Sequence, residues 1–165
     1  MKQIELIKNK ISSLESLKLK LSEWEKEGKK IVFTNGCFDI IHQGHIDYLA
    51  KAKDLGDILI IGLNTDRSVR EIKGKTRPIQ DEKSRAIILA SMQFIDAIVY
   101  FSEPTPYQLI KAIQPDILVK GADYKPEEII GYDIVQAKGG EIKTLTFLEG
   151  YSTSEIEKKI LSEKK

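Results

Sequence analysis

The sequence has little of what builds a disulfide framework and no segment of membrane-spanning length. Its 165 residues contain a single cysteine, Cys37, which can form no disulfide within the chain and cannot supply a cysteine-rich zinc site. The longest apolar run, over residues 58–63, is far shorter than the roughly 20 residues that cross a bilayer. Lys2 is followed by no apolar segment of the kind that marks a secretory signal. We therefore expect a cytoplasmic protein with no membrane partner.

An excess of charge of either sign is also missing. Lysine and arginine total 26 and aspartate and glutamate total 25, which gives a formal net charge of +1 and a pI near 7.7. A domain that binds duplex nucleic acid normally carries a basic face and a high pI, so nucleic acid is not an expected partner. The length fits one domain of about 100–200 residues. A composition with 41% hydrophobic and 31% charged residues is ordinary for a soluble globular protein.

Residues 1–28 differ in pattern from the rest of the chain. Isoleucine and leucine recur there at heptad spacing, lysine and glutamate fill the positions between them, and Gly28 offers a stop. The pattern predicts one amphipathic helix over residues 1–28, packed either on its own domain or on a partner subunit. A membrane-surface role is disfavoured because the polar face mixes glutamate with lysine. We expect this helix to precede a single domain over residues 29–165 and the chain to form a homodimer.

From residue 30 onward, predicted strands alternate with predicted helices. The strands cover 31–34, 57–63, 95–101, 116–120 and 141–147, and the helices cover 45–55, 81–92, 104–113, 132–138 and a last segment after Tyr151. A long polar loop is predicted over 64–80. Strands joined by such helices form right-handed crossovers, so the predicted fold class is α/β with a doubly wound, open parallel sheet. Ligands of these sheets bind beyond the carboxyl ends of the strands, and the loops after Thr34, Leu63 and Lys120 should meet at one edge.

The loop after the first of these strands carries the clearest chemical signal. It leaves a buried strand at Thr34 and leads to a helix N-terminus, where free backbone N–H groups and the helix dipole favour an anion. His42 and His45, the only histidines in the chain, lie three residues apart there, with Gly44 between them. Two imidazole donors beside an anion site can bind phosphate oxygens and stabilise a transition state. The alternatives are a pair of capping or packing histidines, or a metal pair completed by Asp39.

The segment Thr34–His45 resembles the signature of the nucleotidyltransferase superfamily, whose small members join a phosphorylated metabolite to a nucleotide. Within that superfamily, the chain is similar to the D-glycero-β-D-manno-heptose 1-phosphate adenylyltransferases over roughly residues 28–162. The segments that carry this similarity are Ala52–Asp57, Gly62–Val69, Gly74–Ile79, Lys120–Tyr124 and Glu149–Ser154. That enzyme is commonly the second domain of a bifunctional protein whose first domain is a sugar kinase. The chain resembles a stand-alone version, which suggests a separate heptose kinase as a partner.

The resemblance implies a Rossmann-like nucleotidyltransferase fold and a reaction in which ATP and heptose 1-phosphate give ADP-heptose and pyrophosphate. A sugar-phosphate oxygen would attack the α-phosphorus in line with the leaving pyrophosphate, and catalysis would rest on positioning and charge stabilisation. Mg²⁺ is the implied cofactor, bound mainly through the nucleotide phosphates, and no metal-ligating side chains are expected. The product would be a precursor for the lipopolysaccharide core or another heptose-containing glycan.

Motif and resemblance together assign roles to individual residues. Catalytic roles are predicted for His42, His45 and Lys75. Nucleotide contacts are predicted for Thr34, Asn35, Gly36, Cys37, Phe38, Gly44, Gly121, Asp123, Tyr124, Ser152, Thr153 and Ser154. Substrate contacts are predicted for Asp39, Asn64, Asp66, Arg77 and Arg85. Cys37 is expected to contribute its backbone rather than a thiolate, and Asp66, Asp123 and Arg85 also suit a helix cap, a turn and a helix surface.

Two of the predicted site segments have a second explanation. Lys73, Lys75 and Arg77 lie in a segment that could bring cations onto the β- and γ-phosphates as a lid, but a solvated basic loop would have the same composition. Ser152 and Glu155 form a capping box at the start of the last helix. The two hydroxyl residues between them would remain available for phosphate.

Other functions compete with heptose adenylylation. Cytidylyltransferase relatives commonly carry an Arg-Thr pair where Phe147 and Leu148 stand in this sequence, which favours the heptose branch over the cytidylyl branch. The alternatives are cytidylyl or adenylyl transfer to another phosphorylated metabolite, such as a polyol phosphate or flavin mononucleotide, and a non-catalytic nucleotide-binding module. A class I aminoacyl-tRNA synthetase shares the histidine motif, but the chain has no room for a tRNA-binding domain.

Overall fold

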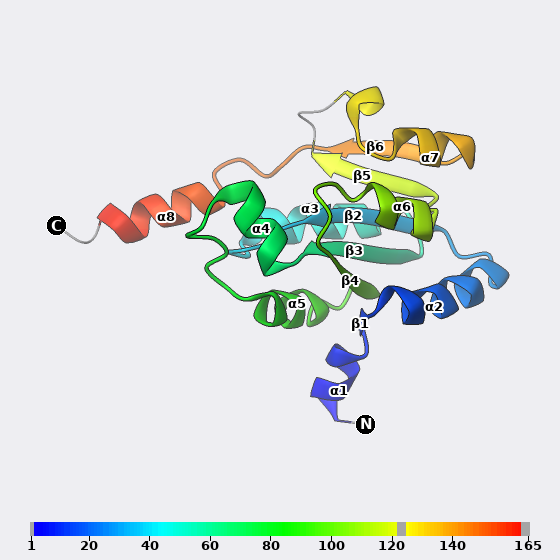
Figure 1. Cartoon of the computed structure of the whole chain (residues 1–165), viewed down its shortest axis with the longest axis horizontal. Helices are drawn as coiled ribbons and strands as arrows, with labels where there is room; N and C mark the ends of the chain where they lie inside the picture. Colours follow the sequence, from blue (N-terminus) through cyan, green and yellow to red (C-terminus); the bar gives the residue numbers. More distant parts are fainter. Residues whose placement is uncertain (1, 122–124, 163–165) are drawn as a thin grey trace.

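A six-stranded parallel sheet forms the centre of the molecule (Figure 1). The computed structural model describes residues 2–121 and 125–162. The strands run in the order β1-β4-β3-β2-β5-β6, and each neighbouring pair is parallel. They are β1 (Ile11–Ser12), β2 (Ile31–Gly36), β3 (Ile58–Asn64), β4 (Ala97–Phe101), β5 (Ile117–Gly121) and β6 (Glu141–Leu145). This topology confirms the predicted doubly wound, open parallel sheet.

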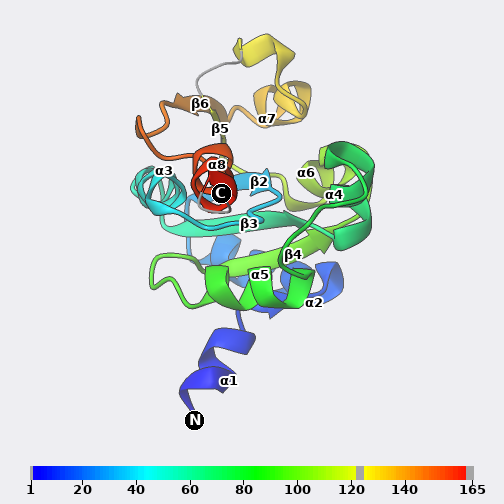
Figure 2. The ribbon, with the colours of Figure 1, turned by 90° about the vertical axis from the view of Figure 1, so that its left-hand side faces the viewer.

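Helices cover both faces of the sheet (Figure 2). They are α1 (Gln3–Lys8), α2 (Leu14–Lys26), α3 (Gln43–Lys53), α4 (Asp66–Lys73), α5 (Glu82–Ala90), α6 (Tyr107–Ile113), α7 (Tyr132–Ala137) and α8 (Thr153–Ser162), with a 3-10 turn over Pro126–Glu128. Residues of α3 and α5 pack in one apolar core, and residues of α2, α6 and α7 pack in a second. Among the described residues, no helix is both long and apolar enough to cross a membrane.

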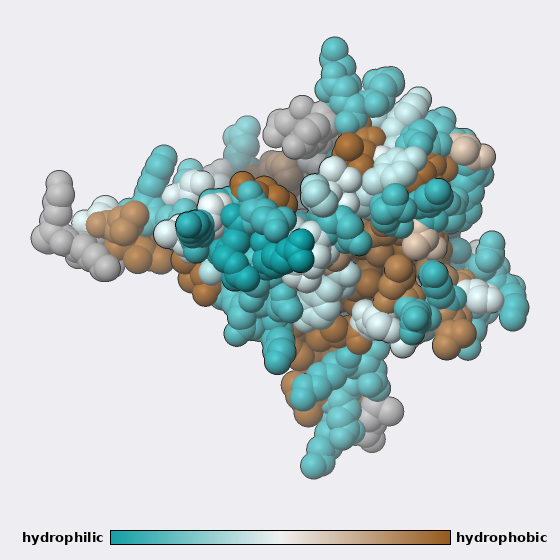
Figure 3. Space-filling model, in the orientation of Figure 1, coloured by the Kyte–Doolittle hydropathy of each residue, from teal (hydrophilic) through white to brown (hydrophobic). Residues whose placement is uncertain are grey.

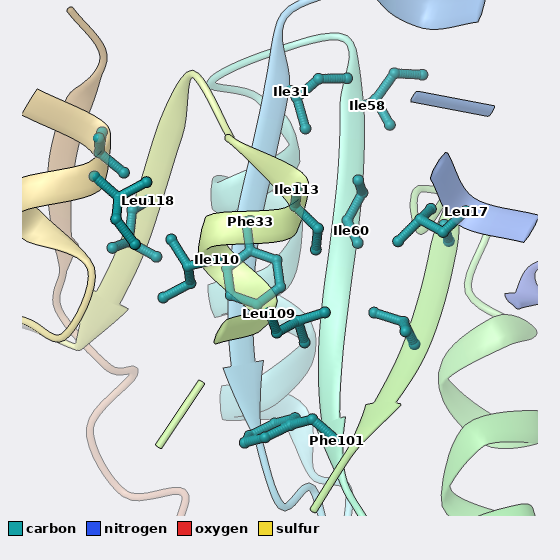
Figure 4. Packing of buried hydrophobic residues seen from close by; sticks show 14 of the residues in the cluster. Leu17, Ile31, Phe33, Ile58, Ile60, Phe101, Leu109, Ile110, Ile113 and Leu118 are labelled. Atoms are coloured by element: carbon teal, nitrogen blue, oxygen red, sulfur yellow. The ribbon is translucent and has the colours of Figure 1, made fainter. Parts of the chain in front are cut away.

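The two cores lie on opposite faces because successive residues of a strand point to opposite sides. Phe33 and Ile60 are fully buried in the core beneath α2 and α6 (Figure 4), whereas Val32 and Ile61 belong to the core beneath α3 and α5. β3 is buried along its whole length, as a central parallel strand covered on both faces should be. These packed strands hold the loops at their carboxyl ends in fixed positions.

The N-terminal segment is not the single helix predicted over residues 1–28. α1 ends before Ile11, which pairs with Ile98 as β1 joins the sheet edge beside β4. α2 then begins after Ser13, whose Oγ accepts a backbone N–H of the first turn at 3.1 Å. The strand gives β4 backbone partners that a continuous helix could not supply, and this gain overrides the heptad spacing. Leu17 is fully buried in the core of the domain, so the segment packs on its own sheet.

The polar loop predicted over residues 64–80 contains a further helix, α4. Thr65 caps this helix by accepting the N–H of Ser68 at 3.3 Å, and Gly74 ends it with a φ of 99°. The helix buries only Ser68 and Val69. So short an apolar stripe gives little periodicity, and the prediction of an uninterrupted loop was wrong for this reason.

Candidate active site

The candidate site lies at the point where the strand order of the sheet reverses. β2 has β3 on one side and β5 on the other, and crevices form at such points beyond the carboxyl ends of the strands. The strands that contain Thr34, Leu63 and Lys120 are neighbours in this sheet, which confirms that the three loops meet at one edge. The loop after β2 leads into α3, whose first N–H groups have no partner within the helix.

The two histidines lie side by side at the start of α3. Their ring centroids are 3.8 Å apart, with an angle of 31° between the ring planes. His42 is the N-cap residue of α3, and its backbone N–H donates to Nδ1 of His45 at 3.4 Å. Since Nδ1 of His45 accepts a hydrogen bond, the proton of the neutral ring is on Nε2. His45 therefore caps the helix with one nitrogen and keeps a donor on the other.

Both imidazoles are neutral at pH 7. Burial lowers the pKa of His42. Burial, together with the repulsion that a protonated His45 would meet from Lys73 and from a protonated His42, lowers the pKa of His45 to about 4. Nδ1 of His42 is buried and has no hydrogen-bond partner among the described residues. An unpaired buried nitrogen costs free energy that a bound polar ligand would recover. The pair therefore provides neutral hydrogen-bonding groups at a helix N-terminus, an arrangement suited to phosphate.

A cavity of about 350 Å³ opens beside His42, between the starts of α3 and α8. It is lined by Ile41, His42, Gln43, Gly150, Tyr151, Ser152, Glu155, Ile156 and Lys159. Gly44 permits the close approach of the two helices, because a Cβ there would lie 3.0 Å from the His42 ring and 3.3 Å from Cβ of Tyr151. A larger cavity of about 720 Å³ lies at the opposite edge, where β2, β5 and β6 begin, and contains neither histidine.

The start of α8 is capped as the sequence predicts. Ser152 Oγ accepts the N–H of Glu155 at 3.1 Å, which satisfies one free donor of the first turn. Thr153 and Ser154 follow in that turn, and their hydroxyls have no hydrogen-bond partner among the described residues. Two hydroxyls in the first turn of α8, next to the cavity residue Ser152, are thus available to a ligand.

Asp39 is buried and anchors the loop that follows α4. Its side chain pairs with Arg77 at 2.7 Å and accepts the backbone N–H groups of Ile79 at 2.8 Å and of Gln80 at 3.0 Å. Burial alone would raise the pKa of Asp39, but the hydrogen bonds from Gln80, Arg77 and Ile79 outweigh it and lower the pKa. Arg77 also pairs with Glu157 of α8. In this structure Asp39 therefore joins the loop after β2 to the loop after α4, and Arg77 joins the latter loop to α8. Their substrate contacts stay predictions.

Arg85 likewise bonds to protein groups. It is fully buried, and its guanidinium donates to the carbonyl of Cys37 at 2.5 Å, to Asp66 Oδ1 at 2.8 Å and to the carbonyl of Gln80 at 3.1 Å. Asn64, another predicted substrate contact, donates to Ser68 Oγ at 2.8 Å. The bonds of Arg85 thus hold together the loop after β2, the start of α4 and the loop after α4.

Several predicted nucleotide-binding residues shape the site through packing. The ring of Phe38, whose φ is 47°, lies edge-on to His45 with a centroid distance of 5.4 Å. Gly36 lies against Phe38, and a Cβ added there would come within 2.9 Å of that ring. A Cβ on Gly121 would come within 2.4 Å of the ring of Phe147. At these positions glycine leaves room for an aromatic ring.

Two further predicted residues, Thr34 on β2 and Cys37 in the loop after it, are at least partly buried. Thr34 Oγ1 and the hydroxyl of Tyr48 are 2.9 Å apart in a buried hydrogen bond. Burial raises the pKa of the Cys37 thiol, so this residue is a thiol rather than a thiolate at pH 7. Asp123 and Tyr124, the remaining predicted nucleotide contacts, lie outside the described residues.

Three lysines, Lys73, Lys75 and Lys120, lie in or next to the segments predicted to form the site. Lys75 is exposed and has no hydrogen bond or ion pair among the described residues, as a mobile cation awaiting a ligand would. Lys73, at the end of α4, is near enough to lower the pKa values of both Cys37 and His45. Lys120 donates to Asn35 Oδ1 across the gap between β5 and β2. No role was predicted for Lys120, because the sequence does not show that its side chain reaches Asn35 of the neighbouring strand.

Comparison with known proteins agrees with this geometry. The model of the cytidylyltransferase-like family matches residues 33–159. The bifunctional protein HldE of Wolinella succinogenes is 52% identical over 151 residues, which cover 92% of this chain and 31% of that protein. The HldE of Citrifermentans bemidjiense is 51% identical, with 93% of this chain and 32% of that protein covered. The chain thus spans about a third of the length of these curated relatives.

Two solved structures share the fold. The lipopolysaccharide core biosynthesis protein from Thermoplasma volcanium GSS1 has a TM-score of 0.59 and 28% identity, and the match covers 75% of this chain and 99% of that one. The pantoate-beta-alanine ligase from Francisella tularensis, solved with beta-gamma ATP and beta-alanine, also has a TM-score of 0.59. Its identity is 18%, over 89% of this chain and 75% of that one, so this likeness concerns the fold alone.

Proposed function

The chain belongs to the cytidylyltransferase-like family, and we propose that it transfers AMP from ATP to D-glycero-β-D-manno-heptose 1-phosphate. The family and the HldE relatives support nucleotidyltransferase activity. The heptose is supported by the sequence segments described above and by about 50% identity to bifunctional HldE proteins. The single observation that carries the chemistry is the neutral histidine pair at the N-terminus of α3, with an unpaired His42 nitrogen beside a cavity.

In the proposed mechanism, the triphosphate of ATP lies at the start of α3. Nε2 of His45 and a ring nitrogen of His42 hydrogen-bond oxygens of the α- and β-phosphates, where negative charge develops in the transition state. An oxygen of the sugar 1-phosphate attacks the α-phosphorus, the bond from that phosphorus to the bridging oxygen breaks, and pyrophosphate leaves on the opposite side. Lys75, and Lys73 beside it, would bind the departing phosphates. The protein contributes orientation and charge stabilisation, with no covalent intermediate.

We propose that Mg²⁺ arrives with ATP. The described residues contain no group of three His, Cys, Asp or Glu side chains that could hold a metal ion. Asp39, the third ligand of the alternative metal pair, is bonded to Arg77 instead. Phosphate and water oxygens would therefore supply the ligands of Mg²⁺, and no step above depends on a metal held by the protein.

One alternative within the family is cytidylyl transfer to a polyol phosphate. The family description supports it, whereas Phe147 and Leu148, which replace the Arg-Thr pair of many cytidylyltransferases, oppose it. A non-catalytic nucleotide-binding module is the alternative from another class. The intact histidine pair and the basic segment beside it oppose that function, because binding alone does not require donors at the reacting phosphates.

The test is pyrophosphate release in the presence of Mg²⁺, with ATP and CTP each crossed against heptose 1-phosphate, glycerol 3-phosphate and flavin mononucleotide. The proposal predicts release with ATP and heptose 1-phosphate only. Release with another pair would replace the substrate and keep the mechanism. A silent panel with nucleotide still bound would support the non-catalytic module.

A further inference from the structure

We infer that Lys120 binds the phosphate of the acceptor, the sugar 1-phosphate, in the crevice between β2 and β5. The inference rests on the proposed function and identifies the group that holds the nucleophile. Three features of the molecule support it: the gap between two strands, the lysine that bridges it, and the position of the other cations.

The crevice follows from where the pairing of the two strands stops. β2 and β5 pair at Val32 with Ile117 and at Phe33 with Leu118. Both strands continue beyond this pair, β2 to Gly36 beside β3 and β5 to Gly121 beside β6. The backbones of β2 and β5 therefore separate at the edge that carries the histidine loop.

Lys120 is the side chain that crosses this gap. Its Nζ donates to Oδ1 of Asn35, the residue that the strand register places opposite it. The amine is half-buried, and burial lowers the pKa of Lys120 to about 8, so the group is still mainly charged at pH 7. Asn35 is neutral, and Lys120 forms no ion pair with any described residue. A partly desolvated cation that is bonded only to a neutral amide is stabilised when an anion binds to it.

The positions of the other cations indicate which anion it is. Lys73 ends α4, which follows β3, so it lies on the β3 side of β2, whereas Lys120 lies on the β5 side. In-line displacement places the attacking and leaving oxygens on opposite sides of the α-phosphorus. With the pyrophosphate directed to the Lys73 side, the attacking phosphate belongs on the Lys120 side. Lys120 would neutralise and orient that phosphate, while Asn35 fixes the direction of the amine.

The first test uses inorganic phosphate and the unmodified protein. The ¹³C resonance of the Lys120 Cε, identified with the Lys120→Met variant, is followed as a function of pH with and without phosphate. A bound phosphate should raise the pKa of this lysine by roughly one unit or more, as an opposite charge within about 4–6 Å does. An unchanged titration at high phosphate concentration would overturn the inference.

The second test separates the two substrates. Methionine keeps the length of the side chain and removes its charge, so Lys120→Met should lower kcat/KM for heptose 1-phosphate by about 10- to 100-fold. Binding of a non-hydrolysable ATP analogue should change less than twofold, and Lys120→Arg should recover part of the activity. Lys111→Met, at an exposed lysine of α6, is the matched control and should behave as wild type. An equal loss of ATP-analogue binding in Lys120→Met would overturn the assignment to the acceptor.

The two tests also distinguish this inference from the proposed function. A wild-type protein that is silent with every acceptor would contradict the proposed function, while the phosphate titration would still decide whether Lys120 forms an anion site. An active wild type whose Lys120 does not respond to phosphate would keep the function and overturn the inference.

Discussion

His45 caps α3 with one ring nitrogen and is the proposed phosphate donor with the other, and substitutions can separate these roles. His45→Ala removes both, whereas His45→Gln keeps a side-chain acceptor for the His42 N–H. Both variants should lower kcat by ~10²–10³, as the loss of one transition-state donor does. Stopped-flow or steady-state pyrophosphate release measures this loss. His45→Gln should retain more of the thermal stability than His45→Ala, and near-normal turnover in either variant would remove His45 from the chemistry.

The same residue predicts a dependence of stability on pH. The pKa of His45 is about 4 in the folded protein against 6.5 for a free histidine. Between these values the unfolded chain binds a proton that the folded site does not, so the free energy of unfolding should fall as the pH decreases from about 6.5 to about 4. Urea denaturation at pH 7, 5.5 and 4.5 measures the slope. In His45→Gln the slope should be smaller, and an identical slope would contradict the lowered pKa.

Asp39 should control stability in a lower pH range. Its folded pKa is lowered, so its contribution is complete above the unfolded pKa of about 3.9 and is lost as the pH falls through the folded pKa. Asp39→Asn leaves Arg77 without its buried partner and should cost roughly 3 kcal/mol at pH 7. Asp47→Asn, which breaks a surface pair with Lys51, is the control and should cost less than about 1 kcal/mol. Equal costs at pH 7 would show that Asp39 does not hold the loop.

At the scale of elements, α2 is an integral part of the domain rather than a free helix. Leu17 is fully buried against the sheet, whereas Leu19, on the same helix, is 73% exposed. Leu17→Ala should lower the free energy of unfolding by about 2–4 kcal/mol because it leaves a cavity in the core. Leu19→Ala should change it by less than about 0.5 kcal/mol. Chemical denaturation of the two variants measures these changes in the free energy of unfolding. A change below about 0.5 kcal/mol for Leu17→Ala would show that α2 is not part of the folded core.

Local sequence specified the start of α8 but not the start of α4. Ser152 caps α8 as predicted, because a cap involves residues only three positions apart. α4 was missed, since its cap at Thr65 lies in a polar segment with almost no apolar stripe. β1 was missed for the opposite reason: its two residues become a strand only because the edge of β4 is beside them.

At the scale of the whole molecule, the expected homodimer stays a prediction, and it cannot use the apolar stripe of α2. That stripe already packs on the protein's own core: Leu17 is part of the core, and Leu14, Leu21 and Trp24 pack against the core beside it. The two projecting helices also carry exposed apolar side chains that could pack on a partner: Ile4 and Leu6 on α1, and Ile160 and Leu161 on α8. Figure 3 shows such apolar surface on the arm formed by α8.

Sedimentation equilibrium over a range of concentrations tests the assembly. A homodimer predicts a mass of twice 18.7 kDa at micromolar concentration and dissociation on dilution. A mass of 18.7 kDa at every concentration would make the chain a monomer. The separate heptose kinase and the cytoplasmic location likewise stay predictions, and a mixture of the two proteins examined by the same method tests the kinase as a partner.

The sequence by itself determined the class of the sheet, five of its six strands, most of the helices and the histidine motif. These depend on apolar periodicity, local caps and the fixed order strand, loop, helix, all of which act between residues close in the chain. Only the tertiary structure decided which polar residues bond to other protein groups and which are available to a ligand. Asp39 and Arg77, 38 residues apart, pair to hold a loop, and Lys120 reaches Asn35 across 85 residues. Such contacts depend on which strands become neighbours and on where their pairing ends, and a linear pattern of residue types does not contain that information.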